Sequence, residues 1–239
     1  MPLQPQHKQI SYIRSDKPIR ILEHVWADLK GPLLEKDVYG FKFFIAFIEE
    51  KTRYTNVYPW LENGDAFVAF KIYEARAERV TGYKIVNLYV DGGGELVTNN
   101  LWAHCHDRGI VIYWTEPYAP EMNSIPERMM RMIIEHASAM LWAAGLPVGF
   151  WAAAVKTSVF LTNRSPATAL QEMTPYEAYF GLKPNLGFLK CRDAALQLMS
   201  PTNFALRRTR PQSLPPTAFL LAIRRLRTSM SCGMCKKII

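Results

Sequence analysis

Cysteine and long apolar segments are both scarce in this sequence. The 239 residues include only four cysteines, at positions 105, 191, 232 and 235. Such a low count does not support a disulfide framework and fits a reducing compartment, the cytosol or the nucleus. No run of about 18 apolar residues is free of charge, and residues 1–17 are polar and proline-bearing, unlike a secretory signal. We therefore expect a soluble protein that is not secreted and has no membrane partner.

Acidic residues are almost absent from the C-terminal fifth of the chain. The formal net charge is +8 and the isoelectric point is near 9.3, which usually indicates an anionic partner such as nucleic acid. Residues 191–239 hold nine of the 29 Lys and Arg residues but one of the 21 Asp and Glu residues, which leaves 20 of each kind in residues 1–190. The positive charge therefore lies in this last segment, and the rest of the chain is neutral overall.

Turn-forming and apolar residues divide the chain into three parts. Residues 1–20 contain three prolines and no clear period, as expected of a linker. Residues 21–190 carry regular patterns and are long enough for one substantial core. In residues 191–239 the pattern dissolves among arginines, serines and prolines. We expect this tail to be disordered or to come from a shifted reading frame; the alternative is a basic tail that binds DNA with salt-dependent affinity.

The middle part predicts an α/β domain. Strand-forming segments occupy residues 21–27, 41–49, 54–61, 84–90 and 110–114, and helical periods occupy residues 63–80, 101–108, 124–144, 148–163 and a short stretch from 175. The first three strands follow one another across turn signals, whereas the last two alternate with helices. This order predicts a mixed five-stranded sheet, an antiparallel three-strand meander plus two parallel strands, flanked by helices.

Three acidic residues stand where these predicted elements begin or end. Asp28 follows the first strand, Asp91 follows the fourth, and Glu127 begins the long helix, with 62 and then 35 residues between them. If the first and fourth strands are neighbours, their acids emerge at one edge of the sheet and the helix can face them. Three carboxylates suit hard divalent cations, and two such ions about 3.5–4 Å apart promote in-line phosphoryl displacement.

Each acid also has a simpler explanation. Asp28 could start a turn before Gly31-Pro32, and Asp91 heads the run Gly92-Gly93-Gly94 in an ordinary Asp-Gly turn. Ser124 and Glu127 have the spacing of a capping box, in which the glutamate would bond back to the backbone amide of Ser124.

A set of motifs in residues 20–190 separates these alternatives. The segments around the acids read HVWADLKGP (24–32), DGGGE (91–95) and PEMNSIPER (120–128), and FIEEKTRY (47–54), FWAAA (150–154), NRSP (163–166), TPYE (174–177) and GLKP (181–184) occur in their expected order. Together they resemble the catalytic core of copia-type LTR retrotransposon integrases, a branch of the retroviral integrase superfamily with an RNase H-like fold. The 35-residue gap before Glu127 is also similar to that superfamily's spacing.

The resemblance implies a role for each matching residue. Asp28, Asp91 and Glu127 would be the catalytic residues and would bind two Mg²⁺ or Mn²⁺ ions. Asn123 would position the substrate, and Arg128 and Arg131 would contact the DNA backbone; loop capping for the asparagine and a solvated helix face for the arginines are the alternatives. The implied partners are element cDNA ends, target DNA and further copies of the chain, and the implied location is the nucleus, or a cytoplasmic particle before nuclear entry.

The sequence departs from the family pattern at several positions. Gly92 and Ser124 replace a family asparagine and glycine, and Pro126 directly precedes Glu127, although the first turn of a helix tolerates proline. The family's upstream His-His-Cys-Cys zinc module is not found in this chain. The other candidate zinc ligands, His104-Cys105-His106 and Cys232-x-x-Cys235, lack a paired set, so we expect no zinc.

Three functions follow from these observations. The favoured one is a metal-dependent polynucleotidyl transferase that joins 3' hydroxyl ends of element cDNA to target DNA. The second is a catalytically inactive remnant that keeps the fold and binds nucleic acid. The third is an independent RNase H-like nuclease, which the transposon-type motifs of residues 150–177 disfavour.

Overall fold

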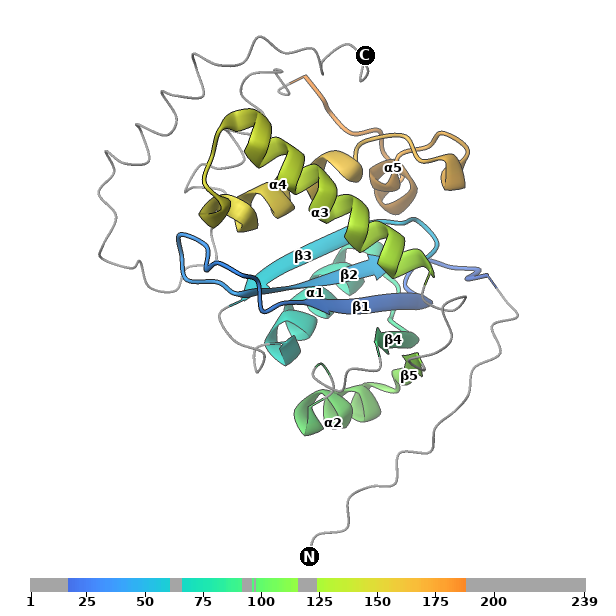
Figure 1. Cartoon of the computed structure of the whole chain (residues 1–239). Coiled ribbons are helices and arrows are strands. Elements are labelled where there is room, and N and C mark those ends of the chain that lie inside the picture. The colour runs from blue at the N-terminus through green and yellow to red at the C-terminus, as the bar shows by residue number, and fades with distance from the viewer. Residues whose placement is uncertain (1–16, 61–65, 92–95, 97, 116–123, 188–239) are drawn as a thin grey trace, which may run out of the picture.

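The computed structural model describes residues 17–60, 66–91, 96, 98–115 and 124–187, and the side chains of Asp91, Thr115 and Ser124 lie outside this description. In this part of the chain, five strands form one sheet: β1 (His24–Lys30), β2 (Phe43–Glu49), β3 (Thr55–Trp60), β4 (Asn87–Asp91) and β5 (Val111–Thr115). Their order is β3-β2-β1-β4-β5 (Figure 1). The first three strands pair antiparallel, and β4 and β5 run parallel to β1. The predicted mixed sheet is confirmed.

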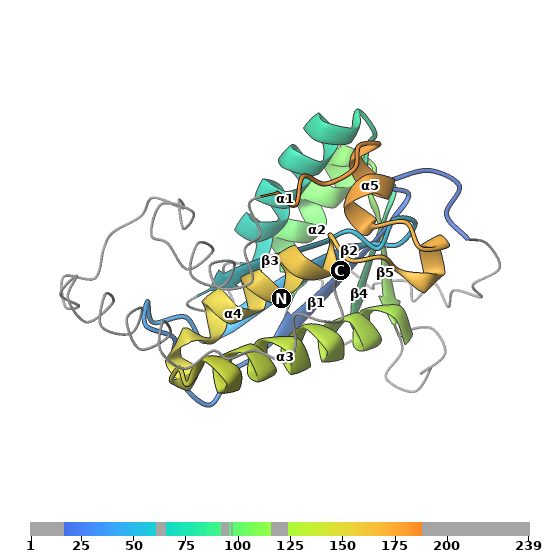
Figure 2. The same cartoon turned by 90° about the horizontal axis from the view of Figure 1, so that it is seen from above.

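Helices cover both faces of the sheet. Within the described residues they are α1 (Ala66–Thr81), α2 (Asn99–Arg108), α3 (Ser124–Ala144), α4 (Trp151–Thr162) and α5 (Pro175–Phe180), with 3₁₀ turns η2 (Val148–Phe150) and η3 (Thr168–Leu170). Seen from above, the sheet lies between α1 and α2 on one side and α3 and α4 on the other (Figure 2). No described helix is long and apolar enough to cross a membrane.

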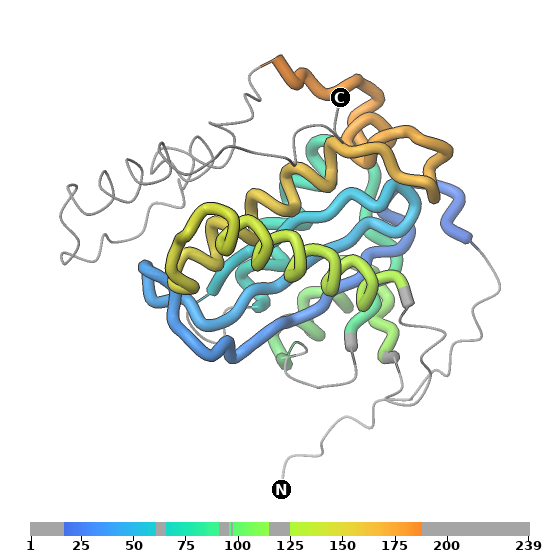
Figure 3. The backbone as a smooth tube through the Cα atoms, turned by 45° about the horizontal axis from the view of Figure 1, so that its top comes forward, coloured from blue at the N-terminus to red at the C-terminus, as the bar shows by residue number. Residues whose placement is uncertain are grey.

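Strand alternation assigns each sheet residue to one of these two layers. Val25, Ala27, Ile45 and Phe47 belong to the core under α1 and α2, whereas Phe44 and Ala46 belong to the core under α3 and α4. Successive strand residues point to opposite faces, so Asp28 shares the α3 face with its cross-strand partner Ala46. Figure 3 shows α3 lying over the sheet alongside α4.

The first strand begins later than the sequence predicts. Residues 21–23 form a turn instead of strand, because Leu22 has a left-handed backbone (φ 62°) and its side chain is fully buried. The backbone N–H of Leu22 donates to the Glu49 carboxylate (3.2 Å), which fixes the turn against the end of β2. The predicted range 21–27 was therefore displaced by three residues.

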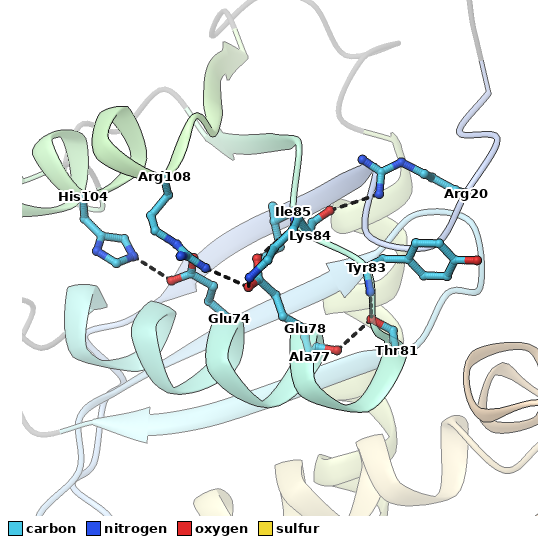
Figure 4. A network of polar contacts seen from close by, with 10 residues as sticks. All are labelled: Arg20, Glu74, Ala77, Glu78, Thr81, Tyr83, Lys84, Ile85, His104 and Arg108. Carbon is cyan, nitrogen blue, oxygen red and sulfur yellow. Dashed lines mark hydrogen bonds and ion pairs between the residues drawn. The ribbon is translucent and has the colours of Figure 1, made fainter.

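A polar network joins α1 to α2 on the face opposite α3 (Figure 4). The buried Glu74 carboxylate accepts from Arg108 Nε (2.9 Å) and pairs with His104 Nε2 (2.6 Å). Glu78, one turn further along α1, binds Arg108 Nη2 (2.8 Å) and Lys84 Nζ (2.5 Å). These contacts join α2 to α1.

Candidate active site

Asp28 lies inside β1 and not at its end. It is the fifth residue of a seven-residue strand, is half-buried, and pairs with Ala46 of β2. This corrects the prediction that Asp28 follows the strand, and it also rules out the turn-starting alternative. The strand continues because Leu29 and Lys30 still pair with β2, beyond the point where β4 stops.

The backbone of Asp91 lies next to that of Asp28. Asp91 is the last residue of β4, directly after Val90, and Val90 pairs with Ala27 of β1 in parallel register. Each acid is thus one residue beyond the same cross-strand pair. The predicted adjacency of the two strands is confirmed, and the side chain of Asp91 lies outside the described residues.

Helix α3 carries Glu127 over the same face of the sheet. Ile125 and Met129 pack against the buried cluster of Trp26, Ile48 and Tyr89. Glu127 lies in the first turn of α3 and is exposed, and Pro126 is buried within the same turn without ending the helix. The prediction that Pro126 is compatible with the helix is confirmed. The capping alternative depends on Ser124, whose side chain is outside the described residues.

The remaining predicted site residues are placed as follows. Arg128 and Arg131 are both exposed on α3, whereas Asn123 falls outside the described residues. Among the side chains that the structure describes, which exclude that of Asp91, no three His, Cys, Asp or Glu groups are placed to hold a metal ion. The convergence of the three carboxylates therefore stays a prediction, while the backbone relationships above fit an all-oxygen donor set.

An aromatic row that sequence analysis missed lies beside the acids. Trp26, Tyr89 and Tyr113 are directly paired across β1, β4 and β5. The rings of Trp26 and Tyr89 stack at 4.5 Å and those of Tyr89 and Tyr113 at 5.1 Å. The Trp26 indole N–H donates to Glu50 Oε2 (2.8 Å). Each residue alone looks like ordinary core, and only the strand register brings them together.

The histidine and cysteine of α2 have structural contacts. His104 pairs with Glu74, and Cys105 is 1% exposed within the core under α1. Burial raises the pKa of the Cys105 thiol to about 12. His106 is exposed and stacks on Trp102. Cys232 and Cys235 lie outside the described residues.

Comparison with known proteins gives the family. The chain is 34% identical over 185 residues to the retrovirus-related Pol polyprotein from transposon TNT 1-94 of Nicotiana tabacum, covering 77% of this chain and 14% of that protein. It is 34% and 32% identical over 181 residues to the corresponding polyproteins from transposons RE2 and RE1 of Arabidopsis thaliana, in each case 75% of this chain and 12% of the relative. The matched segment thus spans 12–14% of the length of these relatives. No family model matches it.

Solved structures give the fold. The catalytic core domain of HTLV-2 integrase, determined in complex with magnesium in a trimeric form, superposes with a TM-score of 0.51 at 12% identity, over 68% of this chain and 99% of that one. A chain of the simian T-cell lymphotropic virus intasome with a PP2A regulatory subunit superposes with a TM-score of 0.55 at 14% identity, over 77% and 62% of the two chains.

The fold of the described residues is that of retroviral integrase catalytic cores. The chain is a homologue of one segment of retrotransposon Pol polyproteins.

Proposed function

We propose that this chain is the metal-dependent polynucleotidyl transferase core of a copia-type retrotransposon integrase, which inserts element cDNA into target DNA. The observation that carries the proposal is the parallel register of β1 and β4, which sets Asp28 and Asp91 one residue beyond the shared pair Ala27–Val90. Positions 28 and 91 then fall on one face by strand alternation, and α3, with Glu127 in its first turn, packs on that face through Ile125 and Met129.

The donor set suits two Mg²⁺ or Mn²⁺ ions. Asp28 and Asp91 would bind the ions from the sheet, and Glu127 would complete the site from the helix, because hard cations prefer carboxylate oxygens and retain water or phosphate oxygen at other positions. When bound, two such metal ions would activate a hydroxyl nucleophile and stabilise the leaving oxygen of the phosphodiester.

The chain's other residues would hold the DNA. Arg128 and Arg131 are exposed on α3, beside or one turn after Glu127, and can pair with backbone phosphates. Asn123, just before the helix, would position the strand to be joined. Retroviral relatives of this fold occur in a trimeric form and in an intasome, so we propose that this chain also works as a homo-oligomer on element ends and target DNA, in the nucleus.

A strand-transfer assay tests the proposal. The full chain is incubated with labelled element-end oligonucleotides and plasmid DNA in Mg²⁺ or Mn²⁺, beside Asp91→Asn as the matched control. We expect joined products from the parent chain and a loss of about a thousandfold or more with the variant, because a ligand to the reacting ions is removed. Equal product from both proteins would overturn the assignment of the acids.

A second candidate is a catalytically inactive core that still binds nucleic acid. Its support is the pair of departures from the family motifs at Gly92, directly after Asp91, and Ser124, three residues before Glu127. The same assay separates the two candidates, since retained DNA binding without turnover by the parent chain would favour the inactive core.

A further inference from the structure

Glu50 is a buried acid beside the start of β1, and the proposed function gives it no role. It follows β2 directly and is 3% exposed. Its backbone N–H donates to the carbonyl of His24 (3.0 Å). His24 is the first residue of β1 and stands four residues before Asp28.

A single carboxylate oxygen of Glu50 holds two rings of β1. Oε2 accepts from Trp26 Nε1 at 2.8 Å and lies 3.3 Å from His24 Nδ1. Both rings are buried, at 3% and 6% exposure. A hydrogen bond to a buried carboxylate is strong and directional, and therefore fixes the plane of the Trp26 indole.

The Trp26 ring is the first of a stacked row that reaches across the sheet and packs against α3. It stacks on Tyr89 at an interplanar angle of 22°, and Tyr89 stacks on Tyr113 at 16°. Trp26 and Tyr89 each stand two residues before a proposed metal ligand, Asp28 and Asp91. The same rings support Ile125 and Met129, which flank Glu127.

We propose that Glu50 is a positioning residue for the metal site: through Trp26 it sets the aromatic row on which the two strand acids and the first turn of α3 depend. This inference rests on the proposed function. Loss of a residue that hydrogen-bonds to a metal ligand typically lowers metal affinity by about 10–100-fold. Glu50 is more distant from the ligands and acts through Trp26. We therefore expect Glu50→Ala to raise the half-saturating Mn²⁺ concentration by about 3–10-fold.

The experiment measures metal binding without relying on activity. The melting temperature of the full chain is followed through a Mn²⁺ titration for the parent, Glu50→Ala, Glu50→Gln and Trp26→Phe. Glu50→Gln keeps an oxygen that can accept from both rings and should recover much of the parent's midpoint. Trp26→Phe keeps an aromatic ring but lacks the indole N–H; it should raise the midpoint as Glu50→Ala does, and it serves as the test if Glu50→Ala does not fold.

Glu74→Gln is the matched control, because Glu74 is an equally buried carboxylate with two side-chain partners on the opposite face. It should lower the melting temperature at every Mn²⁺ concentration and leave the midpoint unchanged. If the Glu50 and Trp26 variants behave in the same way as Glu74→Gln, Glu50 has only a structural role and the inference is overturned.

Asp28→Asn separates this failure from failure of the proposed function. If Asp28→Asn abolishes the Mn²⁺ response while the Glu50 and Trp26 variants keep the parent's midpoint, only the role of Glu50 is lost. If the parent shows no Mn²⁺ response, or if Asp28→Asn responds as the parent does, the metal site itself is wrong and the role of Glu50 falls with it.

Discussion

The side-chain amide of Asn163 pairs with the backbone of Thr55, 108 residues earlier in the chain. Asn163 Oδ1 accepts from the N–H of Thr55 (3.0 Å), and Nδ2 donates to its carbonyl (2.8 Å). Asn163 is 3% exposed and follows α4, and Thr55 opens β3. One amide thus closes the edge strand of the sheet onto the helical layer above it, which explains the asparagine of the NRSP motif.

Asn163→Asp should destabilise the fold by about 2–4 kcal/mol, because a second oxygen would face the Thr55 carbonyl and a charge would be buried. Urea unfolding at pH 7 measures the change. Asn100→Asp is the control: Asn100 is exposed on α2, and the same substitution there should shift the free energy of unfolding by no more than about 0.5 kcal/mol. Similar losses at both positions would contradict the role of Asn163.

The turn between β2 and β3 is built on the buried Glu49 carboxylate. It accepts from the N–H and hydroxyl of Thr52 and from the N–H groups of Lys51 and Leu22. Burial is nevertheless the largest influence, and it raises the pKa of Glu49 above its usual 4.5. The Glu49 carboxyl therefore binds its proton more tightly in the folded protein than in the unfolded chain. The stability gained from this protonation is fully present below pH 4.5 and is lost as the pH rises through the folded pKa of Glu49.

Glu49→Gln removes this titration. The free energy of unfolding of the parent, minus that of Glu49→Gln, should accordingly be larger at pH 4 than at pH 7, as measured by urea unfolding across that range. Thr52→Val should have the opposite effect to Glu49→Gln. Loss of the hydroxyl donor should raise the pKa of Glu49 further and make the free energy of unfolding depend more strongly on pH. A parent-minus-variant difference that does not change with pH would refute the prediction.

The sequence predicted the sheet well because its strands carry strong local patterns. The meander and the two later strands were recognisable from β-branched and aromatic runs between turn residues. The predicted start of β1 is wrong because Leu22 has a left-handed backbone. The Leu22 N–H donates to the Glu49 carboxylate, 27 residues away in the chain. Such a tertiary contact leaves no periodic signal in the chain.

The acids of the candidate site could be chosen from the sequence only through neighbouring motifs. Asp28 and Asp91 each fit an ordinary turn when taken alone, and their adjacency depends on the pairing of Ala27 with Val90. Trp26, Tyr89 and Tyr113 were not identified at all. They belong to three separate strands, and aromatic residues at buried strand positions are too common to indicate a shared row.

Gly31, after β1, explains the Gly-Pro of the first motif. Its φ of 148° is unfavourable for other residues, and a Cβ there would lie 2.9 Å from the Lys42 carbonyl and overlap the Phe43 ring. Gly31→Ala should therefore cost about 2–3 kcal/mol of stability, measured by thermal or urea unfolding. Gly149→Ala is the control, since its nearest contacts would be an ordinary 3.7–3.8 Å; an equal loss at both glycines would argue against the close approach at Gly31.

Cys105 should be chemically inert in the folded protein. Burial, with a smaller contribution from Glu74, raises the pKa of its thiol to about 12, and only the thiolate is nucleophilic or binds zinc. At pH 8, alkylation of Cys105 by iodoacetamide should be more than about a hundredfold slower in the native chain than in urea, as followed by mass spectrometry of the peptide that contains it. The urea-unfolded chain serves as the internal reference, because the same thiol is then solvated. Comparable rates in the two states would mean that the thiol is accessible, and would return Cys105 to the set of possible metal ligands beside His104.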